Sequence, residues 1–473
     1  MTTDVAAGLK ERGLLDVAEL VRVHAGPAAT LVATAWWLIY VTGHWAGRDA
    51  PSVTVGAALV AVAVLLVRPY RVLPPLAIYA ATAVSVAAFV VPLTAPTGWA
   101  GAPDGAMYAC AAWLAVTIAA VIVIWSSARL WLLLLVAASA AIQFKSGWTA
   151  WWGGKDPTQP MWGTFYWYNP YAIFLVPGGL VGLALWIWRK RLIAVLGVFA
   201  FAFASMGVVY STSRASLTVF ILGFALIGVT ALAGSERRRA LRQVFLAAVI
   251  GAAAAYFVGG PPFFPHRASP LAGEQARSTG QSLGQNGGYR LDFWHEALTA
   301  FRRHPLTGGG YKSLVHESIG HVPKGWPLSP YAHNGYLQPL AEGGLILGIP
   351  FLLAACGVAF LCLRTLFRGL VRRQVGGEAV AVAIALGVVM LHSGVDFDWT
   401  YAADFGMFAI LSGLVLGLSL RGGERTDSPR HGRVAHYALV GCLLIGVGTL
   451  GLSAWVQRDG NHTVNLPRPA AQS

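Results

Sequence analysis

Charged residues and cysteines are scarce in this sequence. Charged side chains make up 11% and hydrophobic ones 56% of its 473 residues, whereas soluble domains carry about 25% charged residues. This composition excludes a soluble globular protein and predicts a polytopic membrane protein. The four cysteines all lie in apolar runs and include no C-x-x-C pair, so they indicate neither a disulfide framework nor a zinc site.

Signatures of nucleotide and metal sites are also missing. No G-x-x-x-x-G-K-[ST] phosphate loop occurs in the chain, which argues against a nucleotide-dependent mechanism. None of the twelve histidines pairs with another at H-x-H or H-x-x-x-H spacing, although such close spacing is typical of metal ligands. We therefore expect no metal site and no cofactor.

Long apolar runs recur along the chain, and a membrane span needs about 20 such residues. The first run follows a polar stretch that contains several acids, so we expect a retained anchor and not a signal peptide. We predict thirteen spans, at 27–46, 51–67, 72–92, 106–125, 129–144, 168–188, 192–211, 215–233, 240–258, 337–363, 378–396, 401–420 and 434–456.

The basic residues indicate how these spans are oriented. With the N-terminus in the cytoplasm, most of the 34 lysines and arginines fall in short cytoplasmic links, such as 189–191 and 237–242. By the positive-inside rule, the longest polar segment then lies outside. The formal charge of +14 is thus mainly a topology signal, and we expect no binding of nucleic acid.

This orientation divides the chain into four parts. They are an N-terminal bundle (1–258), an extracytoplasmic loop (259–336), C-terminal spans (337–456) and a polar tail (457–473). Within the loop, residues 268–288 are rich in Ser, Gly and Gln, so we expect them to be flexible. From Arg290 to Arg303 apolar residues recur at helical spacing and predict an amphipathic helix. The glycines at 308–310 predict a tight turn.

A second outside segment, about 145–167, is rich in Trp and Tyr. These aromatics fit an interfacial belt at the membrane surface, which is the simpler interpretation. They also fit a platform on which sugar rings or a lipid stack. Asn169 stands at the start of the span that follows.

Several polar residues near the outside ends of the spans are candidates for chemistry. Arg214 lies between two apolar runs, where a charge is costly and often functional, unless it only snorkels to the interface. Arg290 opens the predicted loop helix and either clamps phosphate oxygens or is an ordinary solvated charge. His333 is either a general base or an ordinary loop histidine. The polar set His392-Ser393-Gly394-Val395-Asp396-Phe397-Asp398 either lines the same cavity or forms hydrogen bonds within itself.

Together these residues resemble the O-antigen ligase and polymerase family of bacterial membrane glycosyltransferases. Gly163-Thr164-Phe165…Asn169-Pro170 resembles one family feature, and four further motifs carry the resemblance. They are Ser213-Arg214-Ala215-Ser216; Arg290…Trp294…His304-Pro305…Gly308-x-Gly310; His333-Asn334-Gly335-Tyr336-Leu337…Glu342-x-Gly344; and His392…Asp396.

The resemblance implies an all-α, GT-C-like transmembrane bundle in the bacterial inner membrane, with the large loop in the periplasm. It implies inverting transfer of a glycan from undecaprenyl diphosphate to a sugar hydroxyl, without a metal or cofactor. His333 would act as the base, and Arg290 and Arg214 would bind the diphosphate. Further substrate contacts are expected from Asn169, Asn334, Tyr336, Tyr311, Arg302, Arg303, His392 and Asp396.

We interpret the chain as a ligase whose acceptor is the lipid A core, and we expect a monomer among membrane lipids. A polymerase or a protein O-oligosaccharyltransferase of the same family would differ only in its acceptor. A transporter of polyprenyl lipids is the alternative from another class. Transporters often contain internal repeats with interrupted helices, and none is evident here, so glycosyl transfer is the favoured interpretation.

Overall fold

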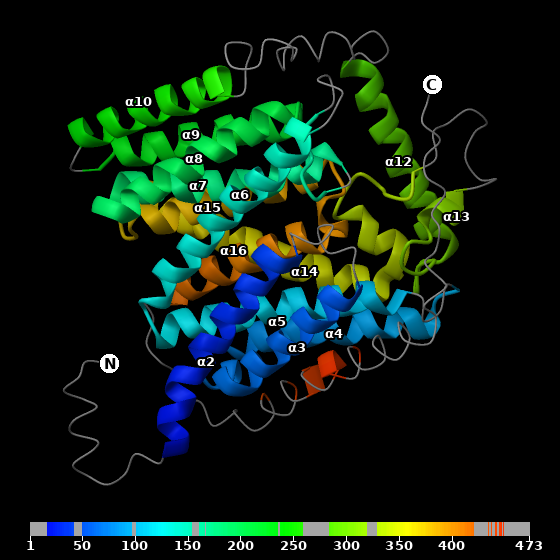
Figure 1. The fold of residues 1–473 in the computed structure, drawn as a ribbon. Helices are drawn as coiled ribbons and strands as arrows, with labels where there is room; N and C mark the ends of the chain where they lie inside the picture. Colours follow the sequence, from blue (N-terminus) through cyan, green and yellow to red (C-terminus); the bar gives the residue numbers. More distant parts are fainter. Residues whose placement is uncertain are drawn as a thin grey trace.

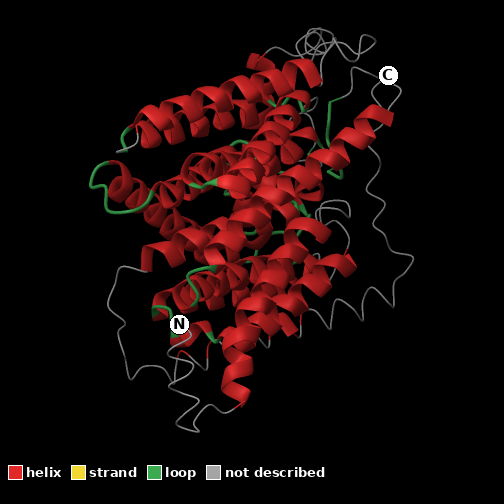
Figure 2. Cartoon of the chain, turned by 60° about the vertical axis from the view of Figure 1, so that its left-hand side comes forward, coloured by secondary structure: helices red, strands yellow, loops and turns green. Residues whose placement is uncertain are grey.

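The computed structural model describes residues 17–41, 50–96, 101–153, 160–165, 167–234, 237–258, 283–318 and 329–420, together with single positions between 434 and 448. Within these residues the regular elements are all helices, and none is a strand (Figure 2). In a helix the backbone N–H and C=O groups bond to one another, and they need such partners because lipid tails offer none. The described chain is therefore all-α, as its composition predicts.

The N-terminal part forms a series of long helices (Figure 1). They are α2 (Val17–Ala35), which continues as the π-helix η1 (Trp36–Val41), α3 (Ala50–Val67), the 3-10 helix η3 (Pro69–Arg71), α4 (Pro75–Thr94), α5 (Ala102–Ile124), α6 (Ala128–Gly153), α7 (Tyr168–Trp188), α8 (Arg191–Tyr210), α9 (Arg214–Leu232) and α10 (Arg237–Ala253), which continues as the π-helix η5 (Ala254–Val258).

The remaining elements belong to the loop and to the C-terminal part. They are α12 (Leu283–Arg303), α13 (Leu314–Ser318), α14 (Leu337–Leu370), α15 (Gly377–Ser393), the 3-10 helix η6 (Asp398–Thr400) and α16 (Ala402–Leu420).

Ten of the described helices are long and apolar enough to cross a membrane, which confirms a polytopic bundle. α15 is a shorter apolar helix of the same kind. The span predicted at 27–46 overlaps α2 and η1 as far as Val41, but these helices are not among the ten. The span predicted at 434–456 lies mostly outside the described residues. Which side of a membrane each end faces stays a prediction.

The helices pack in two groups. In the first, α7 contacts α6, α8, α9 and α15, and 89% of its apolar stretch is buried. In the second, α5 packs against α3, α4 and α16. Figure 1 shows the groups one above the other, with α14 between them and with α12 and α13 at one end of the bundle. Because α12 packs on α14, the loop is held against this end.

Two predictions for the loop are confirmed. The helix expected from Arg290 to Arg303 forms the C-terminal part of α12. Gly308 and Gly310 turn the chain with φ of 68° and 99°, values that favour glycine.

Two predicted boundaries are wrong. α6 does not end near residue 144 but continues to Gly153, because Trp148 packs on Phe144 and Trp151 packs on Tyr210 within the helix bundle. α12 begins at Leu283, so residues 283–288 of the stretch expected to be flexible are helical. The rest of that stretch lies outside the described residues.

The span predicted as one helix at 337–363 is broken. Gly344 has φ 56° and ψ −152°, which glycine adopts far more readily than other residues, so α14 consists of a short first segment and a long second one. The backbone N–H groups of the two following residues donate to the carbonyls of residues 305 and 306 at 2.8 and 3.1 Å. A Cβ on Gly308 would lie 2.3 Å from the Glu342 backbone. The two glycines therefore allow the loop to close on the break.

Candidate active site

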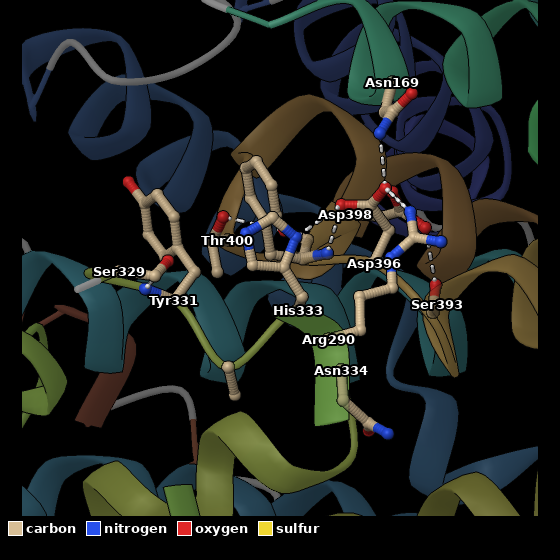
Figure 3. Close-up of polar contacts among 12 residues, drawn as sticks. Asn169, Arg290, Ser329, Tyr331, His333, Asn334, Ser393, Asp396, Asp398 and Thr400 are labelled. Carbon is tan, nitrogen blue, oxygen red and sulfur yellow. Dashed lines mark hydrogen bonds and ion pairs between the residues drawn. The ribbon is translucent and has the colours of Figure 1, made fainter. Parts of the chain in front are cut away.

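A fully buried carboxylate stands at the centre of the polar cluster beyond the end of α15. Asp396 Oδ2 accepts a hydrogen bond from Asn169 Nδ2 at 2.7 Å and one from an Arg290 terminal nitrogen at 3.3 Å. Its Oδ1 lies 3.5 Å from His333 Nδ1 and accepts from the backbone N–H of Phe397 at 2.9 Å. Figure 3 shows Asn169, Arg290 and His333 converging on this side chain. Three predicted site residues are thus brought together by a fourth.

The partners of Asp396 come from four different segments. Asn169 lies in the first turn of α7, Arg290 in α12 and His333 just before α14, while Asp396 stands between α15 and η6. The cluster exists only because α7 packs on α15 and α12 packs on α14. It therefore connects the loop to the helix bundle.

The surroundings of Asp396 keep its carboxyl ionised. Burial alone raises its pKa, but the hydrogen bond from His333 and the electrostatic influence of His333, His392 and Arg290 outweigh burial and lower the pKa to about 2. A buried charge is tolerated when it is paired and hydrogen-bonded. Asp396 meets both conditions, so it can hold its partners in place at neutral pH.

The His333 ring is fixed from several directions. Its φ of 48° is uncommon for a residue other than glycine, and such strain clusters at functional sites. The Trp294 indole N–H donates to the His333 carbonyl at 3.2 Å. Phe293 stacks on the ring at 4.8 Å, and Phe397 meets it edge-on at 4.5 Å. With Nδ1 facing Asp396 and 20% of the side chain exposed, the ring is both oriented and accessible.

The next two residues of this motif support the backbone. Asn334 Oδ1 accepts from the N–H groups of Tyr336 and Leu337 at 2.9 and 3.1 Å, and its Nδ2 donates to the Gly394 carbonyl at 2.9 Å. Figure 3 shows its side chain pointing away from Asp396. A Cβ on Gly335 would lie 2.7 Å from the Trp399 ring. Asn334 and Gly335 thus fasten the histidine segment to the end of α15.

A second buried network, formed by side chains in the first two turns of α14, supports the same segment. Gln338 Oε1 accepts from the backbone N–H of Ala332 at 2.6 Å, and its Nε2 donates to Glu342 Oε1 at 2.8 Å. The same Glu342 oxygen accepts from the backbone N–H of Lys312 at 2.8 Å. Gln338 and Glu342 together therefore join the residue before His333 to the turn that follows the loop glycines.

The two arginines predicted to bind the diphosphate differ in their surroundings, because Arg290 pairs with Asp396 whereas Arg214 lies at the start of α9. Arg290 contacts Asp396 and is 30% exposed. Arg214 is exposed at the first residue of α9, where the Ser213 side chain caps the helix by accepting from the Ser216 N–H. α9 packs on α7 and α15, the helices that carry or precede Asn169 and Asp396, so this helix start belongs to the same end of the bundle.

The other predicted contact residues lie outside the Asp396 cluster. Tyr311 is 3% exposed, and its hydroxyl donates to the Ala88 carbonyl at 2.9 Å. Arg303 pairs with Glu317 at 2.8 Å, and Arg302 is exposed beside it. The Tyr336 hydroxyl donates to the Met390 carbonyl at 2.9 Å. Their predicted roles in substrate binding stay predictions, while their visible contacts are with the protein.

His392 is enclosed rather than open to a ligand. It is 0% exposed, and its two ring nitrogens lie 2.9 Å from Ser216 Oγ and 2.7 Å from Asp398 Oδ2. Of the two interpretations that the sequence left open, hydrogen bonding within the set describes His392 better, and its partner there is Asp398. Sequence reasoning assigned no role in the site to Ser216 or Gln338. The only signal for Ser216 was its place in the motif of residues 213–216.

Within the described part of the chain, no group of three or more His, Cys, Asp or Glu side chains is placed to hold a metal ion. Residues 280–284 read Gly-Gln-Ser-Leu-Gly, which matches the G-x-S-x-G pattern of hydrolases. That pattern needs a preceding strand, and residues 280–282 lie outside the described residues.

The fold and the cluster together define a polytopic helical membrane protein with a buried Asp-Arg-His site at one end of its bundle. Residues 199–352, about a third of the chain, match the family model described as O-antigen ligase. The matched region contains Arg214, Arg290 and His333. The match confirms the resemblance to the O-antigen ligase and polymerase family, whose members are glycosyltransferase-like membrane enzymes. No curated protein matches the chain significantly.

Proposed function

We propose that the chain is a glycosyltransferase of the ligase type. It transfers a glycan from undecaprenyl diphosphate to a sugar hydroxyl of the lipid A core at the outer face of the bacterial inner membrane. The observation that carries the proposal is the attachment of both Arg290 and His333 to the buried carboxylate of Asp396. A cation and a base are thereby held side by side, as transfer from a diphosphate requires.

Arg290 supplies the charge that binds the diphosphate. Its guanidinium has five N–H donors, and one terminal nitrogen contacts Asp396 at 3.3 Å, which leaves donors for phosphate oxygens. Arginine binds such oxygens bidentately. Because Asp396 holds the group in place before the reaction, it can stabilise the charge that develops on the leaving diphosphate. Arg214 at the start of α9 is the second cation.

His333 takes the proton from the acceptor. With Nδ1 turned toward Asp396, the ring proton stays on Nδ1, and Nε2 is the basic nitrogen. The acceptor hydroxyl gives its proton to Nε2 as its oxygen bonds to the anomeric carbon. The bond from that carbon to the phosphate oxygen breaks, and undecaprenyl diphosphate leaves with the electron pair. Asp396 stabilises the imidazolium that forms, as the carboxylate does in a Ser-His-Asp triad. Attack opposite the leaving group inverts the anomeric centre.

The proposed chemistry needs no added cofactor. The donor already carries a good leaving group, and fixed guanidinium charges act where a metal otherwise would. The undecaprenyl chain lies among the apolar helices and membrane lipids, and the protein acts as a monomer with its N-terminus in the cytoplasm and its loop in the periplasm.

The test is transfer by the purified protein in nanodiscs, with EDTA and without nucleotide. Undecaprenyl-diphosphate glycan is the donor, lipid A core is the acceptor, and a gel shift is the readout. His333→Ala is expected to reduce the rate by at least about a hundredfold, because general base catalysis contributes that much or more. His316→Ala, which removes an exposed histidine of the same loop, is the matched control and is expected to retain activity.

Each outcome decides between functions. A gel shift that resists EDTA and is lost with His333→Ala supports a metal-independent ligase. Longer glycan that remains on undecaprenyl diphosphate identifies a polymerase, and glycan on an added protein identifies a protein O-oligosaccharyltransferase. Donor binding without any covalent product would refute transfer and favour transport.

A further inference from the structure

Four buried side chains form a continuous hydrogen-bonded chain beside the Asp396 cluster. Ser213 Oγ donates to Ser216 Oγ at 2.9 Å, Ser216 Oγ lies 2.9 Å from His392 Nε2, and His392 Nδ1 lies 2.7 Å from Asp398 Oδ2. Each of the four residues is at most 2% exposed. The chain runs from the first turn of α9, across the end of α15, to η6.

The donors and acceptors of this chain match one another. Ser213 gives its hydroxyl proton to Ser216, so the proton of Ser216 is left for His392 Nε2. A nitrogen that accepts at Nε2 carries its proton on Nδ1, and Nδ1 then donates to Asp398. Every link has one donor and one acceptor with a neutral imidazole. The three links are thus all paired, although Asp398 Oδ1 is buried without a hydrogen-bond partner among the described residues. Paired links of this kind in a buried network restrict the side chains that they join.

The arrangement has the order of a Ser-His-Asp triad, but it is not placed for nucleophilic catalysis. Ser216 is 0% exposed, and its oxygen already accepts the hydrogen bond from Ser213. A nucleophile must lie within reach of a substrate atom, and this oxygen is enclosed. The chain is therefore a structural connection between two elements.

The two ends of the connection are the informative part. Arg214 lies between Ser213 and Ser216 in the first turn of α9. Asp398, at the other end, is two residues from Asp396, which holds Arg290 and His333. The bonds of His392 thus join two segments. One is the turn that carries Arg214, and the other is the segment between α15 and η6 whose Asp396 holds Arg290 and His333.

α9 is held by packing less closely than α7, which it contacts. Only 33% of its apolar stretch is buried, compared with 89% for α7, so packing restrains it weakly. Catalytic groups must be held closely, since a displacement of about 1 Å can reduce the rate by roughly a hundredfold.

We infer that His392 is a positioning residue that sets the place of Arg214 relative to Arg290 and His333 through its bonds to Ser216 and Asp398. The inference rests on the proposed function for the role of Arg214 in transfer. The anchoring of the α9 turn by His392 stands on the geometry alone.

Two substitutions separate the two bonds of His392. The amide of His392→Asn reaches the position of Nδ1, so it keeps a donor to Asp398 and loses Ser216. The longer side chain of His392→Gln reaches the position of Nε2, so it keeps Ser216 and loses Asp398. Ser216→Ala removes the α9 link alone. Ser85→Ala is the control, because Ser85 is also 0% exposed but bonds only within its own helix.

The rate of backbone amide hydrogen exchange in residues 211–218 measures how firmly the α9 turn is anchored, and it does not depend on an activity assay. We expect faster exchange there in Ser216→Ala and His392→Asn than in the wild-type protein, His392→Gln or Ser85→Ala. Unchanged exchange in Ser216→Ala would overturn the inference. A wild-type protein that transfers no glycan to any acceptor would overturn the proposed function, and the exchange result would still decide the anchoring.

The rates show whether the connection acts through Arg214. Ser216→Ala is expected to lower kcat between about tenfold and a hundredfold, with little change in KM for the acceptor. In an Arg214→Lys background the same substitution is expected to cost less than about twofold, because residues that act through one another are not additive. If the loss of kcat in the double variant equals the product of the two single-variant losses, Ser216 acts independently of Arg214, and the inference is overturned.

Discussion

Replacement of Asp396 should disable the site and weaken the fold together. Four donors point at its two oxygens: Asn169 and Arg290 at Oδ2, and His333 and the Phe397 N–H at Oδ1. Asp396→Ala leaves all four without this acceptor. Removing one member of a buried, paired set typically costs about 3–5 kcal/mol of unfolding free energy. We expect an effect of that order.

Asp396→Asn is not a conservative change here. A carboxamide offers one oxygen and one NH₂ group, and either orientation turns the NH₂ group toward donors. Asn169 can relieve part of the conflict by turning its own amide, but Arg290 or the Phe397 N–H still faces a donor. The substitution also removes the charge that orients His333. In a Ser-His-Asp triad the equivalent change lowers kcat by about ten-thousandfold, and we expect a loss of at least about a hundredfold.

The pH dependence gives a second measurement of the same group. Because the folded-state pKa of Asp396 is lowered to about 2, below the usual value near 3.9, its contribution to stability is fully present above about pH 4 and is lost as the pH falls through about 2. The shift corresponds to roughly 2–3 kcal/mol. Near pH 2 the wild-type and Asp396→Ala proteins should therefore differ less in stability than at pH 7.

Unfolding in detergent, followed by tryptophan fluorescence, and transfer in nanodiscs are the assays. Asp404→Asn replaces a second buried acid, which lies in the first turn of α16, and is the control for substitution of a buried carboxyl group outside the Asp396 cluster. Full transfer by Asp396→Ala, or an unfolding midpoint equal to that of the wild-type protein, would refute the assignment of Asp396 as the residue that holds the site.

Three further changes test other parts of the structure. Gly344→Ala is expected to destabilise the protein by about 1–3 kcal/mol, because its φ of 56° is strained for alanine; an unchanged midpoint would contradict the break in α14. Gln338→Leu removes the bond to the Ala332 N–H and is expected to cost about 1–3 kcal/mol and to lower kcat, whereas activity equal to the wild type would show that this bond does not position His333. Glu378→Gln removes the carboxylate that joins Arg129 and Arg189 and is expected to lower the free energy of unfolding by about 1–3 kcal/mol. Transfer per folded molecule is expected to equal that of the wild-type protein. A loss of transfer would mean that the first turn of α15 is coupled to the Asp396 cluster beyond its last turn.

The helical character of the chain could be predicted from the sequence because it depends on local patterns. Apolar runs of sufficient length must become helices in lipid, and the spacing of Leu291, Trp294, Leu298 and Phe301 predicts the amphipathic part of α12 without any tertiary contact. The end of α6 was misjudged because tryptophans at 148 and 151 pack in the bundle, and the pattern of apolar residues alone does not show those partners.

The motifs likewise predicted candidate site residues but not how these residues contact one another. Arg290, His333 and Asn169 were singled out one at a time, and nothing in the sequence showed that Asp396 holds all three. Asn334 was expected to contact substrate, yet its side chain bonds to the backbone. Such roles depend on which atoms face one another, and residue type does not encode that.

The sequence by itself therefore determined the helical, membrane-spanning class of the described chain and its resemblance to the O-antigen ligase and polymerase family, because hydrophobicity and motif spacing are properties of neighbouring residues. Only the tertiary structure decided that Asp396 is the centre of the site, that His392 connects Ser216 to Asp398, and that Gly344 breaks α14 beneath the loop. These features join segments far apart in the chain. Their free energy arises from burial and from donors and acceptors that meet only after the helices have packed.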